Sequence, residues 1–279
     1  MTKSRFCLGY SVIIVAGAAS ASSVACEPAT GGREVEVELR VGGSTSASTF
    51  ATASGWNVTL EEALVVVGPI VVYENLPVLA RASALPRAAG WVRDLLVPPA
   101  HAHPGHGHFN GGTVRAEWMG QTVVDVLHPG LQDIAIPGVA GSAGSLTIHL
   151  QPAAPEVVGA ERLEGNQVWL VGLAQRDDVI LPFRGGIVIA PEGDRRKIQG
   201  VSAVGLVDEG ARIDVVVNAA AWFLDVDFSE LEGQEVGADG RHQIVPDGAI
   251  ARSLEVGVRS LGTARETSSV WADIEEAVR

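Results

Sequence analysis

Several stretches of the chain alternate apolar and polar residues with a period of two. The clearest is REVEVELRV (33–41), in which Val35, Val37, Leu39 and Val41 alternate with charged residues. This pattern predicts a β-strand with one buried and one solvated face. The run GWNVTLEEALVVVGPIVVYE (55–74) begins with the same alternation and continues as an apolar run, which predicts two buried strands interrupted near Gly68-Pro69.

Further strands are expected along the rest of the chain, separated by glycine, proline, aspartate and asparagine. Extended character resumes in 111–130 after the histidine-rich stretch described below. The other strand candidates are GSLTIHLQP, NQVWLVGLAQ, VILPFRGGIVIA, ARIDVVVNA and RSLEVGVRS (252–260). The C-terminal SSVWADIEEAVR fits either a helix or a final strand. Many strands without alternating long helices predict an all-β fold, an antiparallel β-sandwich of the immunoglobulin-like or jelly-roll-like kind.

The pattern also predicts a domain organisation. Residues 33–279 are expected to form one β-sandwich domain, because no composition break demands a second. An insertion at about 76–112, rich in alanine, leucine and arginine in its first part, predicts short helical turns before the histidine-rich loop. Residues 27–32 (EPATGG) have the composition of a short tether.

The first 26 residues have the composition of an export signal. Lys3 and Arg5 precede an apolar run that is too short for a spanning helix, and small residues lead to Cys26. The ending Ser-Val-Ala-Cys resembles a bacterial lipobox, which implies lipidation of Cys26 and a periplasmic or outer-membrane location. Ser23 stands where leucine is commonest, so plain cleavage after Ala25, giving a soluble periplasmic protein, is the alternative.

Charge and cysteine content narrow the chemistry. The formal net charge is −13, and becomes −15 when the two positive charges of Lys3 and Arg5 are removed with the signal. This acidity argues against nucleic-acid binding and leaves the lipid anchor as the expected membrane contact. The two cysteines are Cys7 and Cys26, so the mature body has no thiol for catalysis, disulfides or metal ligation.

Four of the seven histidines fall in HAHPGHGH (101–108). His103-Pro104-Gly105-His106 fits a type II turn, with proline at the second position and glycine at the third. Extended flanks would place His101 and His103 on one face, and His106 and His108 likewise. Imidazole suits zinc and copper(II), so the stretch predicts a transition-metal site formed by His101, His103, His106 and His108. The alternative is a solvated loop without a specific metal site.

Additional ligands are expected from the segment that follows the histidines. Glu117 is the preferred candidate, and Asp125 and His128 are the others. No catalytic motif accompanies them: the chain has no G-x-S-x-G, H-E-x-x-H or phosphate-binding loop, and no catalytic residue is assigned.

Four pieces of the chain resemble known proteins. The stretch GWNVTLEEALVVVGPIVVYE, the segment HAHPGHGHFNGG, the run VNAAAWFLDVDFSEL and the closing LEVGV resemble periplasmic lipoproteins of high-GC Gram-negative bacteria. The layout is distantly similar to the MbnP-like periplasmic copper-binding proteins, which are β-sandwiches. This resemblance implies the fold class and a metal-binding role. The cysteines common in such proteins are missing here.

These observations predict a cell-envelope lipoprotein that binds zinc or copper for capture, buffering or delivery to an envelope transporter or a metalloprotein. The alternative class is a structural or protein-interaction lipoprotein whose histidine loop is not a specific metal site. A metal-dependent enzyme is the third reading. It would need an open coordination position and a positioned base.

Overall fold

The computed structural model describes residues 32–44, 48–77, 111–128, 130–191, 194–262 and 267–276. The chain divides into two compact units, 1–31 and 32–279, and every described residue belongs to the second. The predicted signal, Cys26 and all but the last residue of the predicted tether therefore lie outside the described residues, as do His101, His103, His106 and His108.

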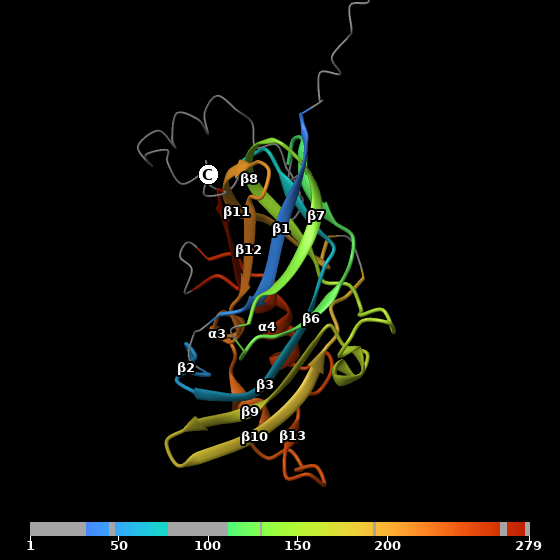
Figure 1. Cartoon of the computed structure of the whole chain (residues 1–279). Helices are drawn as coiled ribbons and strands as arrows, with labels where there is room; N and C mark the ends of the chain where they lie inside the picture. Colours follow the sequence, from blue (N-terminus) through green and yellow to red (C-terminus); the bar gives the residue numbers. More distant parts are fainter. Residues whose placement is uncertain are drawn as a thin grey trace, which may run out of the picture. The chain divides into compact units, whose positions relative to one another are not determined.

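The described chain is mainly β-structure in two sheets, which confirms the all-β prediction. Figure 1 shows β1 between β7 and β12 in the larger sheet. The order of the eight strands in this sheet is β11 (Lys197–Val207), β8 (Gly141–His149), β4 (Ile70–Tyr73), β5 (Val114–Trp118), β7 (Gln132–Val139), β1 (Glu34–Gly43), β12 (Arg212–Val217) and β14 (Val270–Glu275).

The second sheet has six strands and includes the long β9–β10 hairpin seen beside β3 in Figure 1. Its order is β13 (His242–Gln243), β10 (Val179–Ile187), β9 (Val168–Arg176), β3 (Asn57–Val67) and β2 (Thr49–Ala51), with β6 (Thr122–Asp125) paired to the other end of β3. Most pairs in the two sheets are antiparallel as predicted. The pairs β1–β12 and β10–β13 are parallel.

Strand β1 forms as its alternation predicts. Val35, Val37, Leu39 and Val41 are at most 7% exposed, and the charged side chains between them point outward. The outer face continues onto β12, where Arg212 Nε donates to Glu38 Oε2 at 3.0 Å and Arg40 forms an ion pair with Asp214. Pairing β1 with β12 brings together residues about 175 positions apart, so this contact belongs to the tertiary fold.

The predicted break at Gly68-Pro69 is confirmed, and it transfers the chain from one sheet to the other. Strand β3 ends at Val67 in the second sheet, and β4 begins at Ile70 in the first. Gly68 has φ +116°, a conformation that glycine adopts without strain, and its N–H donates to His149 O at 2.9 Å. The two buried apolar runs thereby pack in different layers of the same core.

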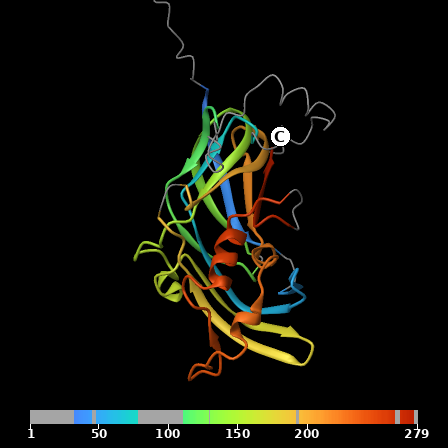
Figure 2. The ribbon, with the colours of Figure 1, turned by 180° about the vertical axis from the view of Figure 1, so that it is seen from behind.

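The expectation of a strand at 252–260 is wrong, because residues Ala249–Val258 form helix α4. Ile250, Ala251, Leu254 and Val258 are buried, which is helical spacing, whereas Val256 is 66% exposed. Gly257 allows the helix to approach α3 (Ala219–Trp222), since a Cβ there would lie 2.1 Å from Trp222 O. Figure 2 shows α4 from behind. No helix in the described ranges is long and apolar enough to cross a membrane.

The C-terminal stretch SSVWADIEEAVR, which fitted either a helix or a strand, contains a strand, since Val270–Glu275 form β14. Strands β11 and β14 are the two edges of the eight-stranded sheet, and they approach each other so that the sheet nearly closes. Gly205 on β11 makes this approach possible, because a Cβ there would lie 2.6 Å from Ile274 Cβ. The two edges pack through side chains and do not pair with each other.

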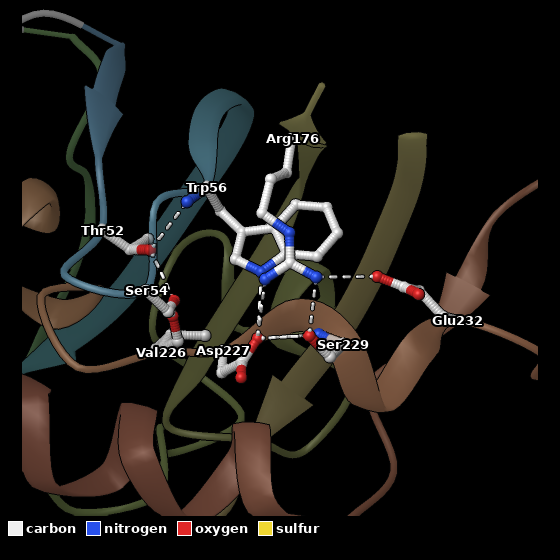
Figure 3. Close-up of polar contacts among 8 residues, drawn as sticks. All are labelled: Thr52, Ser54, Trp56, Arg176, Val226, Asp227, Ser229 and Glu232. Atoms are coloured by element: carbon white, nitrogen blue, oxygen red, sulfur yellow. Dashed lines mark hydrogen bonds and ion pairs between the residues drawn. The ribbon is translucent and has the colours of Figure 1, made fainter. Parts of the chain in front are cut away.

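The second sheet is joined to the 218–232 segment around one buried indole. Trp56 is 0% exposed, and its Nε1 donates to Asp227 Oδ1 at 3.0 Å (Figure 3). The Arg176 guanidinium lies 4.2 Å from the centroid of the Trp56 ring, which is cation–π geometry. Phe228, the first residue of η3 (Phe228–Leu231), packs edge-on against the same indole at 6.0 Å. A further short helix, η2 (Ala160–Leu163), covers part of β3 and β9.

Asp227 is the polar centre of this contact. Its Oδ1 also accepts from Ser229 N at 3.0 Å and from Ser229 Oγ at 2.7 Å, so it caps η3. The hydrogen bonds from Ser229, and then the one from Trp56, hold the pKa of Asp227 below its usual value. The carboxylate is therefore more stabilised in the folded chain than in the unfolded chain.

Replacing Asp227 by alanine is expected to lower the free energy of unfolding by about 1 kcal/mol at pH 7, because partly exposed charge-assisted hydrogen bonds are lost. The contribution of Asp227 is fully present above the ordinary carboxyl pKa of about 3.9 and is lost as pH falls through its depressed pKa. Urea unfolding at pH 7 and pH 3 measures both effects. The control is Asp225→Ala, an exposed neighbour, and an equal loss for both variants would contradict the assignment.

Candidate functional site

The two flanks of the histidine-containing segment, which together form its root, lie at one end of the β4–β5 hairpin. The segment 78–110 leaves the described chain after Pro77 and returns at Gly111. Glu74 N donates to Thr113 O at 2.9 Å, and Asn75 N donates to Gly111 O at 2.9 Å. These two hydrogen bonds extend the antiparallel ladder of β4 and β5, so both ends of the segment are held at the same point of the sheet.

The neighbouring strand β8 fixes this exit point. Ser145 Oγ donates to Asn75 O at 2.5 Å. At Gly144 a Cβ would lie 2.7 Å from the backbone of Asn75 and Leu76, so only glycine permits the observed approach of the two chains. The root of the segment is therefore anchored on three strands of the larger sheet.

An ion pair lies at the same root. Arg115 Nη2 is 3.1 Å from Glu74 Oε2, and Arg115 Nη1 donates to Ala140 O at 3.3 Å. The hydrogen bond from the Thr113 side chain, followed by the charge of Arg115, lowers the pKa of Glu74. Glu74 is thus ionised over the pH range in which histidines titrate.

Glu117, the preferred additional ligand, lies on the same hairpin. It is exposed on β5 opposite Val71, four residues beyond Thr113. Its side chain lines an open groove of about 740 Å³ on the outer face of the larger sheet, together with Glu34 and Glu36. The structure places it with carboxylates and with no described histidine.

Asp125 and His128, the other two candidates, lie together in a different cavity of about 940 Å³. Asp125 ends β6, and its Oδ1 accepts from Leu127 N at 3.2 Å in the turn that follows. Its Oδ2 lies 3.1 Å from His128 Nδ1. The carboxylate thereby orients the imidazole, whose side chain is 81% exposed, and leaves Nε2 as the free ring nitrogen.

An arginine from η2 completes this cluster. Arg162 Nη2 donates to Glu62 Oε1 at 2.7 Å and lies 3.6 Å from Asp125 Oδ2. The hydrogen bond with Glu62 is the main cause that raises the pKa of Arg162. Sequence reasoning missed Arg162 and Glu62, because they lie 100 positions apart and no local motif links them.

The three additional ligand candidates therefore lie at two different sites on the protein. The structure brings Asp125 and His128 together and puts Glu117 in another groove. Within the described ranges, no group of three or more histidine, cysteine, aspartate or glutamate side chains is arranged to hold a metal ion. A complete ligand set would need the four histidines of 101–108, which lie outside these ranges.

The two remaining histidines differ in environment. His149 ends β8 beside Lys197, and burial, followed by the lysine charge, lowers its pKa. His242 on β13 pairs with Phe183 and is only 7% exposed. Both take part in the strands of the fold.

The chain matches no family model, no curated protein and no solved structure. The fold class and the site geometry are therefore inferred from the sequence and structure of this chain alone.

Replacing His149 by glutamine is expected to reduce the pH dependence of stability between pH 8 and pH 5. Because the folded pKa of His149 is depressed, its contribution to stability is present above the ordinary pKa of about 6.5 and is lost as pH falls toward the folded value. Urea unfolding of both chains at pH 8, 6.5 and 5 checks this. Unfolding free energies that stay parallel across the three pH values would contradict it.

Proposed function

We propose that this protein is a cell-envelope lipoprotein that binds a transition metal, zinc or copper, through His101, His103, His106 and His108. Its role is capture, buffering or delivery of the ion to an envelope transporter or metalloprotein. The sequence supports this through the alternating imidazoles and the absence of cysteine after Cys26.

The observation that carries the proposal is the clamped root of the segment. The hydrogen bonds from Glu74 N and Asn75 N bring residues 75 and 111 together before any ion arrives. Because these two ends are already held together, closing the segment around an ion costs no further loop-closure entropy. The acidic chain, with a formal net charge of −13, also favours the approach of cations.

Two carboxylates near the root support the same function. Glu74 belongs to the root, and Glu117 follows on β5. In this proposal Glu117 is an additional ligand that the segment reaches, and His128 with Asp125 is a separate, weaker point of ion contact. A single oriented imidazole with one carboxylate is an incomplete shell for zinc.

The mature chain, prepared without an affinity tag, is expected to bind one zinc or copper(II) ion more tightly than about 10 μM, which corresponds to roughly −7 kcal/mol. Affinity should fall as pH drops through about 6.5, because the imidazoles must be neutral to coordinate. Isothermal titration and elemental analysis after dialysis measure affinity and stoichiometry.

The matched variants separate the candidate ligands. The fourfold alanine variant of His101, His103, His106 and His108 should lose binding, and His128→Ala/His149→Ala should keep it. Unchanged binding in the fourfold variant, or none in the unaltered chain, would reject the proposal in favour of a structural or protein-interaction lipoprotein. Far-ultraviolet circular dichroism verifies that each variant retains its β-structure.

The lipid anchor has its own test. Expressed with residues 1–26 in a Gram-negative host, the chain should incorporate radiolabelled palmitate and sediment with membranes. Cys26→Ala should lose the label, because that thiol is the proposed acylation point, and Cys7→Ala should lose no label from the processed chain. A fully soluble, unlabelled chain would instead support cleavage after Ala25.

A further inference from the structure

The groove that contains Glu117 owes its shape to small residues between two charged strands. On the outer face of the larger sheet, β7 presents Ala135 and Pro137, and β1 pairs with it so that Glu36 faces Pro137 and Glu38 faces Ala135. Strand β5 flanks β7 on the other side through the pair Ala116 and Gly138. Long side chains on both flanks and short ones between them form a trough along β7.

The floor of this groove is apolar and open. Val114 is 40% exposed, and Ala135, Pro137 and Val139 continue the lining along the same face. An apolar strip of this kind supplies favourable burial to a segment that covers it. The lining of the groove lies entirely in one sheet apart from Glu209 in the neighbouring turn.

Among the described residues, the carboxylates that border the groove have no side-chain partner, unlike those further along the same face. Glu38 is bonded to Arg212, and Asp214 to Arg40. In the described part of the chain, the carboxylates of Glu34, Glu36 and Glu117 take part in no hydrogen bond or ion pair.

The nearest cations do not compensate these carboxylates. Arg33 is engaged by Asp208. Arg115 itself lines the groove, but its guanidinium is already paired with Glu74 at 3.1 Å. Glu209, whose carboxylate accepts only from the backbone N–H of Glu36 at 3.3 Å, adds a fourth negative charge to the lining. The groove therefore combines an apolar floor with an uncompensated negative border.

We propose that this groove docks an extended segment of a partner protein that carries arginine or lysine at alternate positions. These side chains all face the groove, so that their aliphatic stems cover the apolar floor and their charged ends meet the carboxylates. Along a strand, Glu34 and Glu36 are separated by about 7 Å, and alternate residues of an extended partner segment have the same repeat. Exposed ion pairs of this kind steer and select a partner, while the apolar floor supplies burial. This inference does not depend on metal binding by the histidines.

The test uses the full chain and a fluorescein-labelled (Arg-Val)4 peptide, followed by fluorescence anisotropy. In 50 mM salt, neutralising the groove is expected to weaken binding about ten-fold, since exposed ion pairs contribute modestly and additively. High salt should weaken the unaltered complex as well. The groove variant combines Glu34→Gln, Glu36→Gln and Glu117→Gln.

The matched control makes the same charge change elsewhere, at three exposed carboxylates of the 156–164 segment: Glu156→Gln, Glu161→Gln and Glu164→Gln. It should bind within two-fold of the unaltered chain. An equal loss of affinity in both variants would show that binding depends only on net charge, which would overturn the proposal. The absence of any binding to the unaltered chain would overturn it as well.

Two other occupants of the groove would give different experimental results. If Arg81→Gln/Arg87→Gln/Arg93→Gln tightens peptide binding, the chain's own arginines occupy the groove and the partner assignment is wrong. If sedimentation shows a dimer that the groove variant abolishes, the occupant is a second copy of the chain. Unchanged affinity in the arginine variant and a monomer in sedimentation are the results expected.

Discussion

The period-two alternation of β1 is the constraint on which both faces of the larger sheet depend. Val35, Val37, Leu39 and Val41 enter the core, so the residues between them must face outward on the same strand. Pairing with β7 on one side and β12 on the other then decides which outward charges meet a partner. Toward β12, Glu38 meets Arg212 and Arg40 meets Asp214. At the other end of β1, Glu34 and Glu36 border the groove over β7, with no partner for their carboxylates in the described part of the chain.

The same sheet carries the root of the histidine-containing segment. Strand β5 supplies Thr113 and Arg115 to the root and Glu117 to the groove, so the two features share one hairpin. The cavity with Asp125 and His128 lies where β6 ends, among residues of η2 and the turns around it. Glu117 is shared by the metal-binding proposal and the partner-docking proposal, whereas the four histidines belong only to the first and Glu34 and Glu36 only to the second.

Much of the fold could be predicted from the sequence because alternation is a local property. Strands β1, β3 and β4 and the break at Gly68 followed directly from it. Strands β7 and β11 were missed, since glycine, alanine and proline dilute the apolar pattern in QDIAIPGV and KIQGVSAVGLV. Helix α4 was mistaken for a strand because Leu254, Val256 and Val258 also alternate, and only packing against α3 distinguishes the two periods.

The candidate site was predictable to a smaller extent. Asp125 and His128 are three positions apart, so their contact is nearly local. Their separation from Glu117, and the arrival of Arg162 beside Asp125, come from how β6, β5 and η2 pack, which no spacing in the sequence encodes. The hydrogen bond between the buried Trp56 and Asp227 also comes from the tertiary fold, because the two residues lie 171 positions apart.

X-ray absorption spectroscopy of the zinc- or copper-loaded chain is the measurement that tests the central claim most directly. Coordination by His101, His103, His106 and His108 predicts a first shell of nitrogen at about 2.0–2.1 Å for zinc, with the multiple scattering of imidazole rings and no sulfur. A shell made only of oxygen, or one that contains sulfur, would contradict it.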